Sequence, residues 1–520
     1  MKQDNFHIIF ILGLPGSGKS TLAKKLATLL NGTHISIGNL IRERLTQNLD
    51  EAELFKDAFQ GKKIFASEWI ARLLKESLST IKQNNYILID AGPPIDNVIR
   101  KLQLNPVCVI YINSSEEICK QRFLTRQEVS EVERNDDILE LFLNRTIHYK
   151  NTLPTILSNI AHLYFINKIN GNVPLELVVR QALSCIYCAL AQKINKQEEF
   201  YYIIQPNIEN IINKIKNFTT VTIEKDKPLI IFNNSHKKDN LPVCNQFLLL
   251  LKPPFRFEEK IFRFINTKLN NNGYEVYAIS IWNGHELRRR KILEAHFELH
   301  YFMATYGIEI IPPFILESIN SENKPIINAY DIIQESSLNE LNKLWKNASK
   351  RNKISKSFWL AEEDEYIILN GHIPKIINQF YDNINTYALY IRQSTHEAKN
   401  WEWLRSQFLG NTDPLKASQG SLRRLAYEKK LNLHKDVDFN NNGFHLSSGP
   451  FEAHRELSLW FGPQNCISYS KNRSLYTQLA CEYIKLEHND NIIHSMLESC
   501  ENLNFQSPQI AKWITEKIII

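Results

Sequence analysis

The sequence predicts an α/β protein with two ordered domains, a parallel-sheet domain over 1–195 and an α+β domain over 241–470. Three observations carry this prediction. Strand-length apolar runs alternate with helical patterns in the first domain, and a strand, helix, strand order opens the second. The chain has 520 residues, of which 43% are hydrophobic, so each domain can bury a core. We expect 196–240 to be a linker and 471–520 a helical C-terminal extension.

In the first domain, strands are expected at 7–12, 86–90, 107–112 and 163–166, with a helix over 22–30. In the second, the apolar run 247–251 predicts a strand, 256–269 an amphipathic helix and 274–281 an alternating strand. The segment over about 308–380 is rich in proline, serine and lysine. It is interpreted as an insertion before a further strand at 386–391. The basic run 288–291 is interpreted as a solvent-exposed helix face.

Composition excludes several classes of protein. Lys and Arg number 62 against 56 Asp and Glu, so the net charge of +6 is too small for a dedicated nucleic-acid binder. Eight scattered cysteines and no recognisable leader indicate reduced thiols and a cytoplasmic location, and Cys185 and Cys188 are interpreted as core residues rather than metal or redox ligands. The apolar runs are far shorter than the roughly 18 residues that a membrane span needs, so no membrane association is expected.

A glycine-rich segment joins the first predicted strand to the first predicted helix. Gly13, Gly16 and Gly18 allow backbone N–H groups to curl around phosphate oxygens at a helix N-terminus, where the helix dipole favours anions. Lys19 follows and is expected to reach the outer phosphates. Ser20 is expected to bind Mg²⁺, and Thr21 is placed in the same nucleotide-binding segment. The motif therefore predicts binding of ATP with Mg²⁺.

The residues around this loop narrow the chemistry. In order they are His34 to Arg42, Asp90-Ala-Gly92-Pro93, Arg122 and Arg126, Arg134 to Asp137, and Arg145 to Tyr149. This arrangement resembles the adenylate kinase family of nucleoside monophosphate kinases. The resemblance implies that Arg42 grips the acceptor phosphate, that Asp90 helps to hold Mg²⁺ and its waters, and that four arginines surround the transferring phosphoryl group: Arg122, Arg126, Arg134 and Arg145.

The acceptor side departs from that family. Pro94 replaces the arginine expected after the Asp90 turn, and Ile37 and Asn39 replace the threonine and aspartate of the first acceptor turn. ATP binding is therefore better supported than the identity of the acceptor.

A histidine module lies near the end of the second predicted domain. His445 leaves a strand, Glu456 follows in the next helix, and Thr412 to Arg423 and Lys252 lie upstream. Together these residues resemble nucleoside diphosphate kinase, which implies a ferredoxin-like α+β fold and a phosphohistidine intermediate. The resemblance makes His445 the nucleophile and Glu456 its orienting partner, and it assigns nucleotide contacts to Lys252, Thr412, Arg423, Asn442 and Ser447.

Here too several positions differ. Leu446 and Ser448 replace a glycine and an acidic residue, Phe297 stands where a tyrosine contacts the histidine, and Thr305 stands where an aromatic ring stacks on the base. Ser406 occupies the place of a phosphate-binding arginine, for which the adjacent Arg405 could substitute. The insertion could form a lid, an oligomer contact or a partner surface.

We therefore expect a nucleotide phosphotransferase that combines monophosphate kinase and diphosphate kinase modules, acts on nucleoside mono-, di- and triphosphates and could form a homo-oligomer. Two alternatives stay open at this point. The chain could be a nucleotide-binding regulatory or sensor protein in which one or both modules are inactive. It could also be a kinase that phosphorylates a protein or a metabolite.

Overall fold

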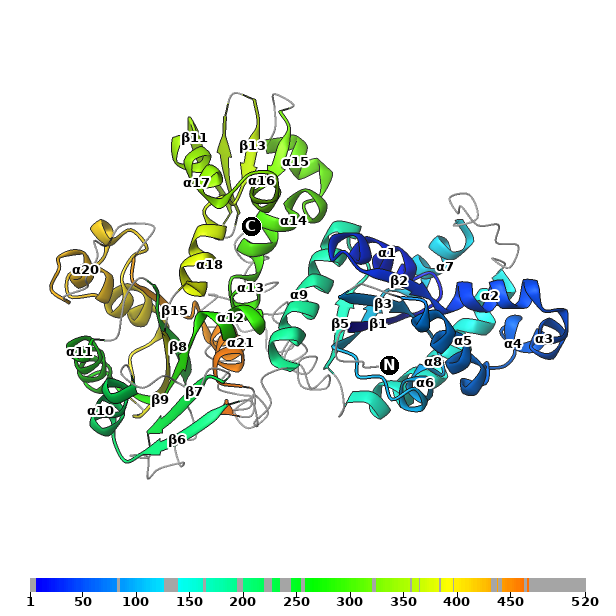
Figure 1. Cartoon of the computed structure of the whole chain (residues 1–520), viewed down its shortest axis with the longest axis horizontal. Helices are drawn as coiled ribbons and strands as arrows, with labels where there is room; N and C mark the ends of the chain where they lie inside the picture. The colour runs from blue at the N-terminus through cyan, green and yellow to red at the C-terminus, as the bar shows by residue number, and fades with distance from the viewer. Residues whose placement is uncertain are drawn as a thin grey trace. The chain divides into compact units, whose positions relative to one another are not determined.

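The computed structural model divides the chain into two compact units (Figure 1). Among the described residues, the first comprises those up to Ala189 with Tyr306–Lys324, and the second comprises Leu190–Thr305 with Pro325 to Cys466. The structure describes residues 6–466 apart from short segments at 82–84, 126–138, 162–164, 194–199, 219–226, 234–244, 254–257, 320–323, 356–357, 364, 383–384, 396, 432–436, 438–441 and 463–464.

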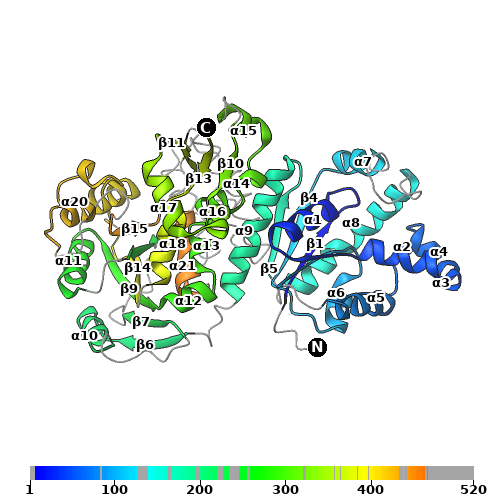
Figure 2. The same ribbon diagram turned by 45° about the horizontal axis from the view of Figure 1, so that its top comes forward.

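The first unit is built on a five-stranded sheet in the order β2-β3-β1-β4-β5, with every neighbouring pair parallel. The strands are β1 (His7–Gly13), β2 (Thr33–Ser36), β3 (Tyr86–Asp90), β4 (Cys108–Asn113) and β5 (Phe165–Asn170). The helices are α1 (Lys19–Leu29), α2 (Ile37–Gln47), α3 (Leu49–Leu54), α4 (Lys56–Phe59), α5 (Ser67–Ser79), α6 (Ile95–Lys101), α7 (Glu116–Thr125), α8 (Leu139–Ala161) and α9 (Leu175–Lys193) (Figure 2).

The apolar sequence of β1 explains its central place. Residues 8–13 are all buried because helices cover both faces of a parallel sheet, so such a strand carries apolar side chains on both faces. The carboxyl ends of parallel strands meet at one edge of the sheet, which brings Gly13 at the end of β1 close to Asp90 at the end of β3. The expected parallel sheet is confirmed, and β2 is an additional strand.

The second unit contains a six-stranded sheet in the order β15-β8-β14-β9-β7-β6. Its strands are β6 (Tyr201–Gln205), β7 (Leu229–Asn233), β8 (Gln246–Leu251), β9 (Tyr274–Trp282), β14 (Thr386–Gln393) and β15 (Phe444–Leu446). If β8, β9, β14 and β15 are numbered 1 to 4 along the chain, their order across the sheet is 4-1-3-2. Each neighbouring pair among these four strands is antiparallel. Helix α11 (Glu259–Asn270) follows β8, and α21 (Pro450–Phe461) follows β15.

The described part of 196–240 differs from the expected linker. It contains β6, α10 (Ile208–Phe218) and β7, and β7 pairs with β9 to extend the sheet. The physical reason is that Ile211, Ile212 and Ile215 lie on one side of α10 and are completely buried in the sheet's core. The polar residues between these positions concealed the apolar stripe.

The expected insertion is folded. After β9 and before the insertion lie α12 (Gly284–Arg289), α13 (Ile292–His296) and most of α14 (Glu298–Ile310). The segment over about 308–380 contains α15 (Pro313–Ile319), α16 (Ala329–Glu335), α17 (Leu338–Asn347) and α18 (Ile373–Tyr381). The insertion also carries a second sheet in the order β10-β13-β12-β11, from β10 (Ile326–Asn328), β11 (Lys350–Ser355), β12 (Phe358–Glu362) and β13 (Ile367–Leu369).

Several smaller expectations can now be judged. Cys185 and Cys188 are fully buried free thiols, as expected of core residues. The basic run 288–291 is not wholly solvated, because Arg290 is buried and its Nε donates to Glu286 at 2.8 Å. No helix in the described part of the chain is long and apolar enough to cross a membrane. The extension over 471–520 lies outside the described residues, and the cytoplasmic location and the homo-oligomer stay predictions.

The reassigned segment gives a stability test. Ile211→Ala should lower the free energy of unfolding by roughly 2–5 kcal/mol, because it leaves a cavity in a buried core. Ile204→Ala in β6 is the matched control and should have little effect, because Ile204 is 66% exposed. Denaturant unfolding of both variants measures the difference, and equal effects would contradict the packing of α10 on the sheet.

Candidate functional site

The first candidate site is the turn between β1 and α1. Gly16 and Gly18 have φ angles of +77° and +95°, a region that other residues adopt only under strain. A Cβ atom on Gly16 would lie 2.0 Å from the carbonyl oxygen of Cys119 in α7. The loop is therefore packed against α7 so closely that only glycine fits. Ser20 and Thr21 occupy the first turn of α1, where backbone N–H groups are available to an anion.

Two side chains complete this turn. The Nζ atom of Lys19 donates to the carbonyl oxygens of Gly13 at 2.7 Å and Leu14 at 2.9 Å, so the ammonium group lies over the loop. The hydroxyl oxygen of Tyr149, from α8, accepts a 2.6 Å hydrogen bond from the backbone N–H of Gly13. Burial raises the pKa of Tyr149, so its hydroxyl stays neutral beside the loop. Tyr149 ends the last of the segments that resemble the adenylate kinase family. The sequence did not indicate that its hydroxyl contacts the glycine loop.

Asp90 lies at the adjacent strand end and is 5% exposed. The Nε2 atom of His34 donates to Asp90 Oδ2 at 2.6 Å, and Ser36 Oγ donates to Asp90 Oδ1 at 3.2 Å. Both contacts come from β2, so the carboxylate is fixed at the sheet edge that also carries the glycine loop. An oriented carboxylate next to a serine hydroxyl suits a hard cation such as Mg²⁺.

The arginines predicted for phosphoryl transfer are partly described. Arg122 Nη1 donates to the Gly171 carbonyl at 3.1 Å, and Arg145 Nη2 donates to the Phe59 carbonyl at 3.0 Å. Arg42 Nη1 donates to Asn39 Oδ1 at 3.0 Å, so a residue that departs from the family pattern orients the arginine that is predicted to bind the acceptor phosphate. Arg126 and Arg134 lie outside the described residues.

The second candidate site surrounds His445 in β15. Its Nε2 atom donates to Glu456 Oε1 at 2.7 Å, and Ser447 Oγ donates to Glu456 Oε2 at 2.6 Å. Glu456 is completely buried, and this burial raises its pKa to about 7. Burial also lowers the pKa of His445, and the charges of Arg405, Lys252 and Arg423 act in the same direction. The imidazole is therefore neutral, with its proton directed at Glu456.

Two guanidinium groups flank this histidine along the strand. Arg405 Nη1 donates to the Leu446 carbonyl at 2.8 Å, and Arg423 Nη2 donates to the Phe444 carbonyl at 2.9 Å. These carbonyls belong to the residues on either side of His445. Arg405 therefore lies beside His445, whereas Ser406 donates back to Glu402 within its own helical turn, and the substitution of Arg405 for the phosphate-binding arginine stays a prediction.

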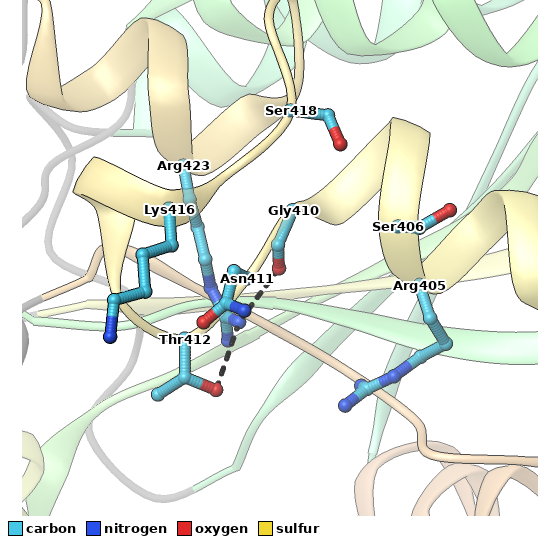
Figure 3. A pocket seen from close by; sticks show the side chains of 8 residues that line it. All are labelled: Arg405, Ser406, Gly410, Asn411, Thr412, Lys416, Ser418 and Arg423. Atoms are coloured by element: carbon cyan, nitrogen blue, oxygen red, sulfur yellow. Dashed lines mark hydrogen bonds between the residues drawn. The ribbon is translucent and has the colours of Figure 1, made fainter.

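Both arginines line a pocket of about 340 Å³, shown in Figure 3, together with Ser406, Gly410, Asn411, Thr412, Lys416 and Ser418. Arg423 also donates to the Gly410 carbonyl at 3.1 Å and is only 6% exposed. Burial lowers the pKa of Arg423 to about 9, and the nearby charge of Arg405 contributes. A buried cation beside a second cation favours an anionic ligand such as a phosphate chain. Sequence reasoning missed Lys416 and Ser418.

The remaining predicted residues are distributed as follows. Asn442 donates to the Thr412 carbonyl at 3.3 Å and so ties the pocket loop to the approach to β15. Ser447 is completely buried, where its Oγ accepts from the Leu248 N–H and donates to Glu456, and its expected nucleotide contact stays a prediction. Phe297 packs on His296 and Phe380, and Thr305 bonds back to Tyr301 within its helix.

Comparison with known proteins concerns the first site. The family model described as an AAA domain matches residues 12–140. Adenylate kinase 1 of Schistosoma mansoni is 33% identical over 142 residues, which cover 26% of this chain and 71% of that protein. Adenylate kinase isoenzyme 1 of Rattus norvegicus is 27% identical over 186 residues, covering 35% and 93%. UMP-CMP kinase 1 of Oryza sativa subsp. japonica is 28% identical over 157 residues, covering 29% and 61%.

The glycine loop gives a binding test. Gly16→Ala should weaken ATP binding at least about tenfold, because the new methyl group meets the Cys119 carbonyl and shifts the backbone N–H groups that surround phosphate. Gly38→Ala in α2 is the control, because its nearest new contact is an ordinary 3.6 Å. Calorimetric titration with ATP measures both, and unchanged binding by Gly16→Ala would exclude the loop as the phosphate site.

Proposed function

Because its N-terminal unit makes this chain a member of the nucleoside monophosphate kinase family, whose members are phosphotransferases, we propose that the unit transfers the γ-phosphoryl group of ATP to a nucleoside monophosphate. The observation that carries the proposal is Lys19 lying over a glycine loop at the edge of a parallel sheet, beside the fixed carboxylate of Asp90. In such a transfer the protein mainly positions the reactants and neutralises developing negative charge.

The roles follow from position. The loop N–H groups and Lys19 hold the β- and γ-phosphates once Lys19 exchanges its bonds to the loop carbonyls for bonds to phosphate oxygens. Ser20 and Asp90 would hold Mg²⁺, whose charge neutralises the phosphate oxygens when it is bound. Arg122 and Arg145 supply guanidinium groups for the moving phosphoryl group, and each guanidinium is oriented by a hydrogen bond to a backbone carbonyl, Gly171 for Arg122 and Phe59 for Arg145.

The acceptor is a nucleoside monophosphate whose phosphate meets Arg42. Asn39 accepts a hydrogen bond from the Arg42 guanidinium. Arg42 is therefore oriented by an amide side chain, at the position where the family has the carboxylate of an aspartate. The named relatives act on adenylate or on uridylate and cytidylate, so AMP, UMP and CMP are the acceptors to test first.

The matching prediction compares two lysines of α1. Lys19→Ala should lower kcat for diphosphate formation by about 100-fold or more, because a charge that stabilises the transition state is removed. Lys24→Ala removes an exposed lysine from the same helix and should leave the rate unchanged. A coupled assay with each monophosphate measures both variants. A Lys19→Ala enzyme that keeps its full rate would refute the proposed role of the loop.

We further propose that the second unit exchanges phosphoryl groups through His445. The observation that favours this activity is the geometry around the His445 imidazole, whose Nε2 is held by Glu456 and whose adjacent carbonyls are bonded to two guanidinium groups. Within the described residues, His445 Nδ1 makes no hydrogen bond, so its lone pair is available. The order of β15, β8, β14 and β9 agrees with the ferredoxin-like fold that the resemblance to nucleoside diphosphate kinase implies.

The reaction has two balanced steps. Nδ1 attacks the γ-phosphorus of a nucleoside triphosphate, an N–P bond forms, and the bond to the β-phosphate oxygen breaks to release a diphosphate. The Nε2 proton stays on the imidazole, where the Glu456 carboxylate stabilises the positive charge. A terminal oxygen of a second diphosphate then attacks the phosphorus, the N–P bond breaks and neutral His445 is restored.

This proposal predicts a pH dependence. Labelling of the protein by γ-labelled ATP should fall as the pH drops below about 7, the value to which burial raises the pKa of Glu456. A protonated Glu456 donates to Nε2, which moves the imidazole proton to Nδ1 and removes the nucleophilic lone pair. The measurement is acid-labile label on the protein after an alkaline quench at each pH.

Two controls accompany this measurement. His445→Asn should take up no acid-labile label, whereas His285→Ala, at a side chain that is 73% exposed, should label like the unmodified chain. Constant labelling between pH 5 and 8 would contradict the role of Glu456. Label that persists in His445→Asn would exclude His445 as the nucleophile.

A further inference from the structure

A second histidine lies against the His445 pair. His296, at the end of α13, is 4% exposed, and its ring centre is 4.7 Å from that of His445. One ligand atom each from His296, His445 and Glu456 lies within 4.8 Å of the others. The three residues come from a helix, a strand and a second helix, so the fold brings them together from separate parts of the chain.

Within the described residues, only one of the two ring nitrogens of His296 has a hydrogen-bond partner. The indole Nε1–H of Trp460 can only donate, and it donates to His296 Nδ1 at 3.3 Å, so Nδ1 carries a lone pair. This lone pair lies 3.6 Å from Glu456 Oε1, which is also an acceptor. Two electron-rich atoms therefore face each other in a buried place. The other ring nitrogen, Nε2, has no hydrogen-bond partner within the described residues.

We propose that His296, His445 and Glu456 form a binding site for a divalent transition metal of the Zn²⁺ class. Two imidazole nitrogens and one carboxylate oxygen are a ligand set that Zn²⁺ accepts, with a further position left for water. A cation between the facing atoms replaces their repulsion by attraction, and it takes the His296 Nδ1 lone pair at the cost of the long hydrogen bond from the Trp460 N–H. Mg²⁺ prefers oxygen ligands, so the Mg²⁺ that accompanies ATP does not compete for this site.

The separations suit such an ion after small side-chain rotations. Ligand atoms about 2.0–2.2 Å from a tetrahedral Zn²⁺ are roughly 3.3 Å apart. The His296 to Glu456 separation of 3.6 Å is close to this value, and the His445 to Glu456 separation of 2.7 Å must open slightly. His445 is the most accessible of the three side chains at 22% exposed, so the ion enters from its side.

Metal binding would switch off the second unit, a consequence that rests on the function proposed above for His445. The metal takes the Nε2 lone pair of His445, and the proton that occupied Nε2 moves through solvent to Nδ1. The imidazole stays neutral, but its Nδ1 now carries hydrogen and cannot attack phosphorus. Zn²⁺ should therefore suppress labelling of the protein by ATP, whereas added Mg²⁺ should not.

The test uses the full chain and Co²⁺, whose visible absorption reports low-coordinate nitrogen and oxygen ligation. We expect one saturable Co²⁺ per chain, displaced by Zn²⁺. His296→Asn and Glu456→Gln should each weaken binding at least about tenfold. His285→Ala removes an exposed histidine and should bind like the unmodified chain. No saturable spectrum in the unmodified chain, or equal affinity in His296→Asn, would overturn the site.

A measurement on the unmodified chain covers the case in which a variant fails to fold. The Co²⁺ protein should show two strongly shifted, exchangeable imidazole N–H resonances, one from each histidine ligand, and fewer than two would overturn the assignment. The labelling experiment with ATP tests the phosphohistidine proposal separately from the metal site. If Zn²⁺ binds but the metal-free chain takes up no label from ATP, the phosphohistidine proposal fails while the metal site stands.

Discussion

The turn from β1 into α1 is the constraint on which the first unit depends. It requires positive φ angles at Gly16 and Gly18, and it leaves no room for a Cβ atom between Gly16 and the Cys119 carbonyl. The N–H of Gly13 is bonded to Tyr149 of α8, and Lys19 is bonded to the loop carbonyls. Helices α7 and α8 are thereby tied to the end of the central strand, so the phosphate loop and the packing of the unit are specified by the same contacts.

The two proposed phosphate sites are built differently. The first presents backbone N–H groups and one lysine at a helix N-terminus, where the donors are fixed by the backbone. The second presents Arg405 and Arg423, whose guanidinium groups are fixed by carbonyls of β15 and the neighbouring loop. In both units, as far as the structure describes them, hydrogen bonds to backbone carbonyls orient the cationic side chains. The positive charge of these side chains remains available to an anion.

The sequence predicted the features that are local and missed those that depend on distant contacts. Gly13 to Thr21 is contiguous, so its spacing alone identified the loop, and the short spacing from His445 to Glu456 anticipated their 2.7 Å contact. His296 reaches the same cluster only through tertiary packing, which no spacing reveals. Ser447, to which the resemblance assigned a nucleotide contact, is buried by tertiary packing against β8 and α21, which its place in the sequence does not reveal. The apolar side of α10 was concealed by the polar composition of its surroundings.

The most direct test of the central claim isolates the first unit within the full chain. A His445→Asn chain, whose second unit lacks the proposed nucleophile, is incubated with γ-labelled ATP, Mg²⁺ and AMP, UMP or CMP in turn. We expect label in the corresponding nucleoside diphosphate, and we expect this label to be lost when Lys19→Ala is added. ATP and monophosphate that both bind without forming a labelled diphosphate would contradict it and would favour a protein that binds nucleotides without converting them.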